Sequence, residues 1–190
     1  MDSACGSRMW NVTQTPPTLY LMVGLPASGK STRAKQIEEE RQALRLTPDE
    51  WMIPLFGHHD ADGKRDVLEG RFVWLALRAL RRGVDVVLDF GVWGKDERTA
   101  LRALATDVGG SSELVYLEID EDEQRRRRDS RAPTTGETTF YISDDDLASY
   151  RLLFQVPDDE ELGGTELDSP PGDHASWSSW ASERRPTSID

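Results

Sequence analysis

"MVGLPASGKSTR", residues 22–33, decides the fold of this chain because it joins the end of an apolar segment to a segment rich in helix formers. Within it, Gly24 to Ser31 matches the pattern of glycine, four residues and then Gly-Lys-Ser. The two glycines permit a tight turn whose backbone N–H groups point inward, and the start of the helix adds its positive end. A chance glycine-rich turn is the alternative, but the flanking strand and helix patterns favour a phosphate-binding loop, or P-loop.

The residue types of this loop predict its ligand. Lys30 can reach the β- and γ-phosphates of a nucleoside triphosphate, and the hydroxyl of Ser31 can bind Mg²⁺. We therefore expect ATP and Mg²⁺ as cofactors. The residues expected to bind ATP are Gly24, Pro26, Ala27, Ser28, Gly29, Lys30, Ser31 and Thr32.

Apolar runs of strand length alternate with helical patterns along most of the chain, which predicts an α/β fold around a parallel sheet. The expected strands are 18–24, 44–46, 84–90 and 113–119. The expected helices are 29–44, 64–82, 96–108, 121–131 and 144–155. A fifth strand near 165–167 is left open. Ligands of such sheets bind at the carboxyl ends of the strands, where the motifs should gather.

The two ends of the chain differ in composition from its middle. Residues 1–17 are small and polar with two prolines, which predicts a flexible leader. One kinase-sized domain is expected over 18–162. Residues 163–190 are rich in Gly, Ser, Pro and Asp without periodicity, which predicts a disordered tail that carries Trp177 and Trp180.

The composition excludes several classes of protein. The formal net charge of −12 disfavours nucleic acid and anionic membrane as partners, because surfaces that bind them need clustered Lys and Arg. Cys5 is the only cysteine, so an intrachain disulfide is impossible. The apolar runs are too short to cross a bilayer. A cytoplasmic protein is expected, and the oligomeric state stays open.

A P-loop alone does not separate kinases from GTPases or motor ATPases, but the short chain without an NKxD-like stretch favours small kinases. The chain resembles the P-loop kinases grouped with the phage polynucleotide kinase domain, zeta-type toxins and chloramphenicol phosphotransferase, and bacterial "AAA family ATPase" proteins of this size. The motifs that carry the resemblance are "GLPASGKST", "LTPDEW", "VVLDFGVW" and "RRRRDSR", between residues 20 and 162. It implies a three-layer α/β/α P-loop NTPase of the nucleoside-kinase type, with four or five strands and an Arg-rich lid helix.

The resemblance assigns a catalytic role to Asp49, just past the second strand, where related kinases carry an aspartate that takes the proton of the attacking hydroxyl. A carboxylate within hydrogen-bond reach of the acceptor suits this task. The alternative is that Pro48-Asp49 caps a helix beginning at Glu50. Glu50 and Arg71 are further candidates for contact with the substrate.

Asp89 ends an otherwise apolar strand, where a carboxylate is costly to bury without a partner. We expect that partner to be Mg²⁺, with Ser31 as the second ligand, or else a substrate hydroxyl; a structural hydrogen bond is the alternative. Trp93 follows at the same end of the sheet. It either stacks on a planar substrate or packs within the protein.

Five arginines lie on the expected helix after the fourth strand: Arg125, Arg126, Arg127, Arg128 and Arg131. In the resembling kinases, arginines here form a lid over the triphosphate, and guanidinium groups suit the charge that develops on the transferring phosphoryl oxygens. The resemblance favours Arg127 and Arg131 as catalytic and Arg128 as ATP-binding. Ala132 stands where many relatives have asparagine, which leaves the register open by a residue, and a solvated basic face is the alternative.

Three functions fit these observations. The first is an ATP-dependent phosphotransferase, a P-loop kinase that acts on a hydroxyl of a nucleoside, sugar or antibiotic-like metabolite; a toxin acting on a nucleotide sugar is a variant. The second is a polynucleotide 5′-hydroxyl kinase, against which the net charge speaks. The third is an ATP-binding regulator or scaffold whose Trp-containing tail engages a partner. Asp49 discriminates, because a sensor has no evident use for it.

Overall fold

The computed structural model describes residues 15–58, 62–130, 142–164 and 167–185. The expected leader therefore lies almost wholly outside the described residues. Its last residue, Pro17, accepts a hydrogen bond from the N–H of Ser111 (2.8 Å), immediately before the first strand.

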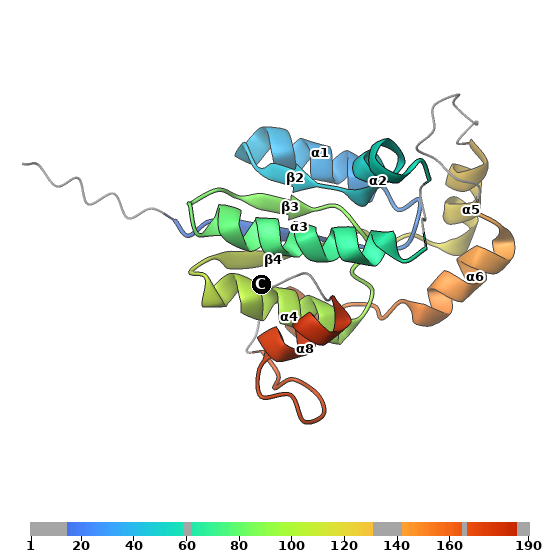
Figure 1. The fold of residues 1–190 in the computed structure, drawn as a ribbon. Helices are drawn as coiled ribbons and strands as arrows, with labels where there is room; N and C mark the ends of the chain where they lie inside the picture. Colours follow the sequence, from blue (N-terminus) through green and yellow to red (C-terminus); the bar gives the residue numbers. More distant parts are fainter. Residues whose placement is uncertain (1–14, 59–61, 131–141, 165–166, 186–190) are drawn as a thin grey trace, which may run out of the picture.

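The four strands are β1 (Thr18–Val23), β2 (Leu44–Leu46), β3 (Val86–Leu88) and β4 (Ser111–Tyr116). They form one parallel sheet in the order β2-β3-β1-β4 (Figure 1). The expectation of an α/β fold with a parallel sheet is confirmed, with four strands among the described residues. Residues 165 and 166 of the possible fifth strand lie outside the described part of the chain.

Alternate residues of β1 face opposite layers, as the two-residue period of a strand requires. Tyr20 and Met22 pack in a core with Ala34 and Ile37 of α1 (Lys30–Arg41). Leu19, Leu21 and Val23 belong to a larger core that includes α3 (Lys64–Leu80) and α4 (Lys95–Asp107). Because helices cover both faces, the strands read as continuous apolar runs. The three-layer architecture is confirmed (Figure 1).

Helices α2 (Pro48–Phe56), α5 (Glu121–Ser130) and α6 (Asp144–Leu153) stand at the carboxyl ends of the strands. α2 packs on α3 through an edge-to-face contact of Trp51 with Phe72, whose ring centroids are 5.3 Å apart. α5 and α6 project beyond the sheet (Figure 1). α6 begins with a reciprocal capping box between Ser143 and Asp146.

The structure corrects the expectation of a disordered tail. The short helix α7 (Asp159–Leu162) is followed by α8 (Trp177–Arg184), which lies against α4 (Figure 1). Trp177 and Trp180 are 8% and 5% exposed and belong to the larger core. Their spacing of three residues places both on one helix face, but an eight-residue helix in a polar segment is too short to show helical periodicity.

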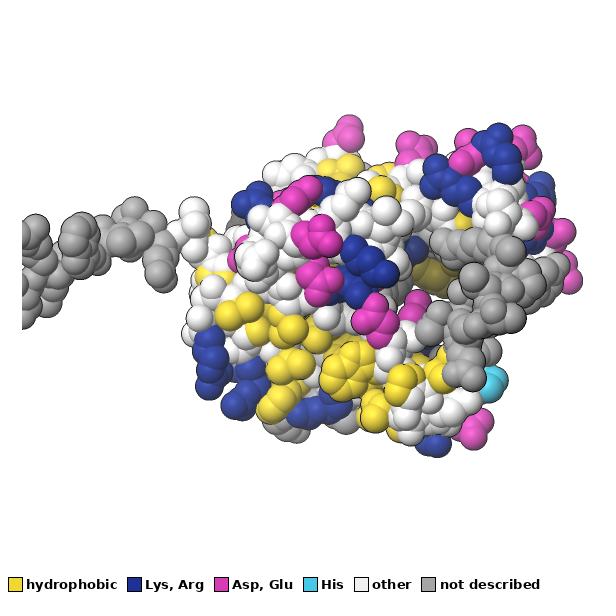
Figure 2. Space-filling view, turned by 90° about the horizontal axis from the view of Figure 1, so that it is seen from above, with side chains coloured by type: hydrophobic (Ala, Val, Ile, Leu, Met, Phe, Trp, Pro, Cys, Tyr) yellow, Lys and Arg dark blue, Asp and Glu magenta, His cyan; other side chains and the backbone are white. Residues whose placement is uncertain are grey.

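The surface carries both exposed apolar side chains and mixed charges. Figure 2 shows hydrophobic side chains gathered on the face seen from above, and acidic and basic side chains interspersed toward its right-hand end. The exposed large apolar residues include Leu44, Trp51, Leu55, Phe56 and Val67. No helix in the described ranges combines the length and apolar character needed to cross a membrane.

Candidate functional site

The P-loop connects β1 to α1 through a backbone that requires glycine at its first position. Gly24 has a φ of 149°, and a Cβ there would lie 2.6 Å from the carbonyl oxygen of Leu117 and 2.7 Å from Oγ of Ser28. Gly29, immediately before α1, has a φ of 102°, and Ala27 has a φ of 67°. The turn therefore leaves no room for a side chain where β1 ends, which is what close approach of a phosphate needs.

Lys30 folds back over this turn. Its Nζ donates to the carbonyl oxygens of Gly24 and Leu25, both at 2.9 Å. The ammonium group thus stands at the mouth of the loop, at the positive end of α1. The buried Oγ of Ser28, in the same loop, has no hydrogen-bond partner among the described residues.

Asp89 and Ser31 meet at the end of β3. Oγ of Ser31 lies 3.3 Å from Oδ1 of Asp89, while Oδ2 of Asp89 accepts a hydrogen bond from Arg45 at 3.1 Å. Burial raises the pKa of Asp89; Arg45 and Ser31 oppose that rise, and the negative charge of Asp49 adds to it. Asp49 follows the carboxyl end of β2 and Asp89 follows that of β3, so both carboxylates lie at the same edge of the parallel sheet.

These oxygen donors fit Mg²⁺. Hydroxyl and carboxylate oxygens are its preferred ligands, and it usually keeps waters and binds substrate phosphates in addition. No group of three or more His, Cys, Asp or Glu side chains in the described ranges could hold a metal without further ligands. A metal at Ser31 and Asp89 would therefore need phosphate oxygens, as expected beside a P-loop.

Asp49 lies in the first turn of α2, whose N-cap is Thr47. Its Oδ1 accepts a hydrogen bond from Nη1 of Arg65 on α3 (3.0 Å), and the Asp49 side chain is about half exposed. The alternative that Pro48-Asp49 caps a helix beginning at Glu50 is wrong, because α2 begins at Pro48 and contains Asp49. The carboxylate of Glu50 pairs with Arg45.

The lid helix α5 reaches the P-loop through Arg127. Its Nη1 donates to the carbonyl oxygens of Ser28 (3.2 Å) and Ala27 (3.5 Å), and its Nε pairs with Glu123. The same Nη1 would lie 3.8 Å from a Cβ on Gly29. The structure therefore brings Arg127 to the loop, which fits the expected lid position.

Arg128, the lid arginine expected to bind ATP, contacts α6. Nη1 of Arg128 donates to Asp144 at 2.6 Å and thereby ties α5 to α6, while its Nε donates to Asp129 at 2.8 Å. Hydrogen bonds to Asp129 and Asp144 raise the pKa of Arg128. Arg131 lies outside the described residues, so its predicted catalytic role stays a prediction.

Most of the chain matches the model of a known protein family. The family model AAA_33, described as an AAA domain, matches residues 19–157, which include the P-loop, Asp49, Asp89 and α5. The chain belongs to this family. A comparison with curated protein sequences finds no match at a significant level.

Solved structures resemble this AAA domain in fold. A sugar kinase from Janibacter sp. HTCC2649 has a TM-score of 0.54 and 16% identity over 77% of this chain and 82% of its own. Chaetomium thermophilum Kti12 in complex with ADP-AlF3 has a TM-score of 0.57 and 18% identity over 90% of this chain and 99% of its own. A chain of the Pnkp1/Rnl/Hen1 RNA repair complex has a TM-score of 0.58 and 18% identity over 75% of this chain and 45% of its own.

At these identities the likeness shows the fold of the AAA domain, and that fold is the one of small P-loop kinases. The resemblance derived from the four motifs is therefore confirmed at the level of the group. The roles of single residues stay predictions.

Two residues of the AAA domain that were predicted to contact the substrate, Arg71 and Trp93, pack against aromatic side chains of the protein. Arg71 lies over the ring of Trp74, 4.2 Å from its centroid, on its own helix α3. The ring of Trp93 packs against that of Tyr150 on α6, with centroids 5.0 Å apart, which favours the packing alternative. The buried Nε1 of Trp93 has no hydrogen-bond partner among the described residues.

Sequence reasoning missed Arg45, a basic residue inside a three-residue strand. Besides Asp89, its guanidinium binds Glu38 on α1 (2.8 Å) and Glu50 on α2. Burial would lower the pKa of Arg45, but hydrogen bonds to Glu50 and Glu38 raise it above its usual value. Arg45 thus fixes the carboxylate of Asp89 relative to both helices, and only the polarity of an otherwise apolar strand could have signalled it.

Gln124 was also missed. This fully buried side chain on α5 donates to the carbonyl oxygen of Pro26 in the P-loop (2.8 Å) and accepts from Arg151 on α6. A pocket of about 230 Å³ lies beside this contact. It is lined by Leu25, residues 116–119, Arg151, Phe154 and Val156.

Proposed function

We propose that this AAA domain is an ATP-dependent kinase that transfers the γ-phosphate of Mg·ATP to a hydroxyl of a small molecule. One observation carries the proposal: a half-exposed carboxylate, Asp49, is held by Arg65 beyond the carboxyl end of β2, at the edge of the parallel sheet where β1 leads into the P-loop. A protein that only senses ATP has no evident use for a carboxylate in this place.

The chain's own residues supply the steps of the transfer. Lys30, the loop N–H groups and Arg127 bind and orient the triphosphate and offset the charge on its oxygens. Asp49 accepts the proton of the acceptor hydroxyl while that oxygen bonds to phosphorus and the bond to ADP breaks. Mg²⁺, held by Ser31 and Asp89, would neutralise charge on the phosphate oxygens. The pocket beside Leu25 and Phe154 is the natural place for the nucleoside.

The polynucleotide kinase alternative finds support in the fold likeness to a chain of an RNA repair complex. The net charge of −12 and the interspersed charges near the lid speak against an extended nucleic-acid groove (Figure 2). We therefore favour a small acceptor. The regulator alternative loses its main support, because Trp177 and Trp180 are buried in the core and cannot engage a partner from a free tail.

The test is ADP release from Mg·ATP across a panel of nucleosides, sugars, aminoglycosides and 5′-hydroxyl oligonucleotides. One acceptor class should stimulate the wild type well above its basal rate. Asp49→Asn should lower the stimulated kcat by about a hundredfold or more and leave ATP affinity unchanged. Asp145→Asn is the matched control, since Asp145 is an exposed acid in the first turn of α6.

The outcome that overturns the kinase assignment is equal activity of the wild type and Asp49→Asn with every acceptor. Stimulation by the oligonucleotides alone would establish the polynucleotide alternative. Slow ATP hydrolysis at the same rate in the wild type and Asp49→Asn, with ATP binding retained in both, would support the ATP-binding regulator instead.

A further inference from the structure

A continuous line of ion pairs connects the C-terminal helix to Asp49. Nη1 of Arg185, the C-cap residue of α8, donates to Oε2 of Glu69 at 2.5 Å. The other oxygen of Glu69, Oε1, accepts from Nε of Arg65 at 3.1 Å. Nη1 of Arg65 in turn donates to Oδ1 of Asp49 at 3.0 Å. We call these four residues the relay.

The two inner residues of the relay are more buried than the two outer ones. The side chain of Asp49 is 53% exposed and that of Arg65 is 29% exposed, whereas those of Glu69 and Arg185 are 9% and 15% exposed. Burial raises the pKa of Glu69, while Arg185 and Arg65 oppose that rise. Arg185 therefore helps to keep Glu69 ionised, and an ionised Glu69 holds Arg65 firmly.

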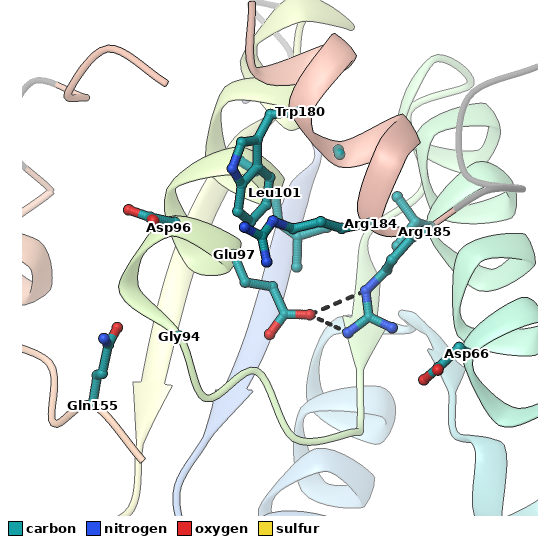
Figure 3. A pocket seen from close by; sticks show the side chains of 12 residues that line it. Asp66, Gly94, Asp96, Glu97, Leu101, Gln155, Trp180, Arg184 and Arg185 are labelled. Atoms are coloured by element: carbon teal, nitrogen blue, oxygen red, sulfur yellow. Dashed lines mark hydrogen bonds and ion pairs between the residues drawn. The ribbon is translucent and has the colours of Figure 1, made fainter. Parts of the chain in front are cut away.

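Arg185 is held by the packing of α8 and by an ion pair with α4. α8 is anchored in the larger core by Trp177 and Trp180. Figure 3 shows the guanidinium of Arg185 directed at Glu97 of α4, and its Nε lies 3.0 Å from Oε1 of that residue. The inner end of the relay thus rests on α3, α4 and α8 together, while its outer end carries a solvent-facing carboxylate.

We propose that α8 positions Asp49 for phosphoryl transfer through the relay, with Arg65, Glu69 and Arg185 as positioning residues. The inference rests on the proposed kinase function. A catalytic carboxylate must be held in one orientation to take a proton, and a misplacement of about 1 Å costs as much as a hundredfold in rate. A long arginine side chain fixes the orientation of a carboxylate only when the arginine itself is held by a second hydrogen bond. Glu69 provides that second bond, because it accepts from Nε of Arg65 while Nη1 of Arg65 donates to Asp49.

The relay has a matched control in the same molecule. Glu161 on α7 is also a buried glutamate paired with an arginine, Arg98 on α4, but no described ion pair links it to Asp49. Glu69→Gln and Glu161→Gln therefore remove the same charge from similar surroundings. Both variants should lower the melting temperature, but only Glu69→Gln should lower kcat with the acceptor, by about tenfold or more.

Further measurements separate positioning from folding. KM for ATP should stay unchanged in Glu69→Gln, and the variant should have no additional effect on kcat in an Asp49→Asn background. Arg65→Gln, at a more exposed site, should lower kcat as Glu69→Gln does, and Arg65→Lys should recover part of it. In thermal unfolding, Arg185→Gln and Asp49→Asn should act non-additively, whereas Glu161→Gln and Asp49→Asn should add.

The relay is overturned if Glu69→Gln keeps the wild-type kcat although its melting temperature falls, or if Glu161→Gln lowers kcat equally. Failure of the kinase proposal looks different, because then no acceptor stimulates even the wild type. In that case additivity of the Arg185→Gln and Asp49→Asn effects on unfolding would still refute the coupling.

Discussion

Gly24 is the first residue of the P-loop, and its surroundings leave no room for a Cβ. A methyl group there would approach the Leu117 carbonyl and the Ser28 hydroxyl within 2.7 Å, at a φ that L residues rarely adopt. We expect Gly24→Ala to destabilise the protein by about 1–3 kcal/mol and to abolish binding of a fluorescent ATP analogue. Urea unfolding and a binding titration measure the two effects.

Gly83 provides the control for this prediction. It also has a positive φ of 78°, but a Cβ there would meet nothing within 4 Å. Gly83→Ala should therefore cost only about 1 kcal/mol through backbone strain and leave nucleotide affinity unchanged. Equal losses of affinity in both variants would mean that the effect at Gly24 is global unfolding rather than obstruction of the P-loop.

Arg45 stabilises the folded protein by pairing with the buried carboxylate of Asp89. Arg45→Gln leaves Asp89, which is almost fully buried, without its cationic partner, while Glu38 and Glu50 remain partly hydrated. We expect a loss of about 3 kcal/mol in the free energy of unfolding. Arg33→Gln breaks an exposed pair with Glu40 and should cost less than about 1 kcal/mol. Similar losses in the two variants would contradict the prediction.

At the scale of elements, α6 begins with a capping box, and Arg128 of the lid helix α5 donates to Asp144 in the same turn. The N–H of Asp146 donates to Oγ of Ser143, and the carboxylate of Asp146 accepts from the N–H and the hydroxyl of Ser143. Ser143→Ala should lower the free energy of unfolding by about 1 kcal/mol. Ser149→Ala, in the body of the same helix, should have little effect.

The same cap has a predictable pH dependence. Hydrogen bonds from Ser143 lower the pKa of Asp146 below its usual range. A carboxyl with a lowered pKa in the folded state stabilises that state above its unfolded pKa, and this contribution is lost as the pH falls through the folded pKa. The difference in melting temperature between the wild type and Asp146→Asn should therefore be full at neutral pH and shrink in acid. A difference that grows in acid would contradict the assignment.

For the molecule as a whole, the sequence predicted what depends on neighbouring residues. The P-loop, the four strands and the capping box are local patterns, so a single chain was enough to find them. Gln124 and α8 were missed because their partners lie far away in sequence: the contact of Gln124 with Pro26 spans 98 residues. The contact of Arg45 with Asp89 also spans 44 residues. The relay to Asp49 exists only after α3, α4 and α8 pack together, which no local pattern encodes.

The packing of α8 in the larger core predicts that the described chain unfolds as one unit. Trp180 is 5% exposed there, so Trp180→Ala should cost about 3–5 kcal/mol, whereas Leu152→Ala, at a residue 88% exposed, should cost almost nothing. The transitions followed by far-UV circular dichroism and by tryptophan fluorescence should coincide in the wild type and shift together in Trp180→Ala. If α8 were only loosely attached, the fluorescence transition alone would shift. The sheet would then keep its stability without α8, and the C-terminal helix could not hold Arg185 firmly enough to position Asp49.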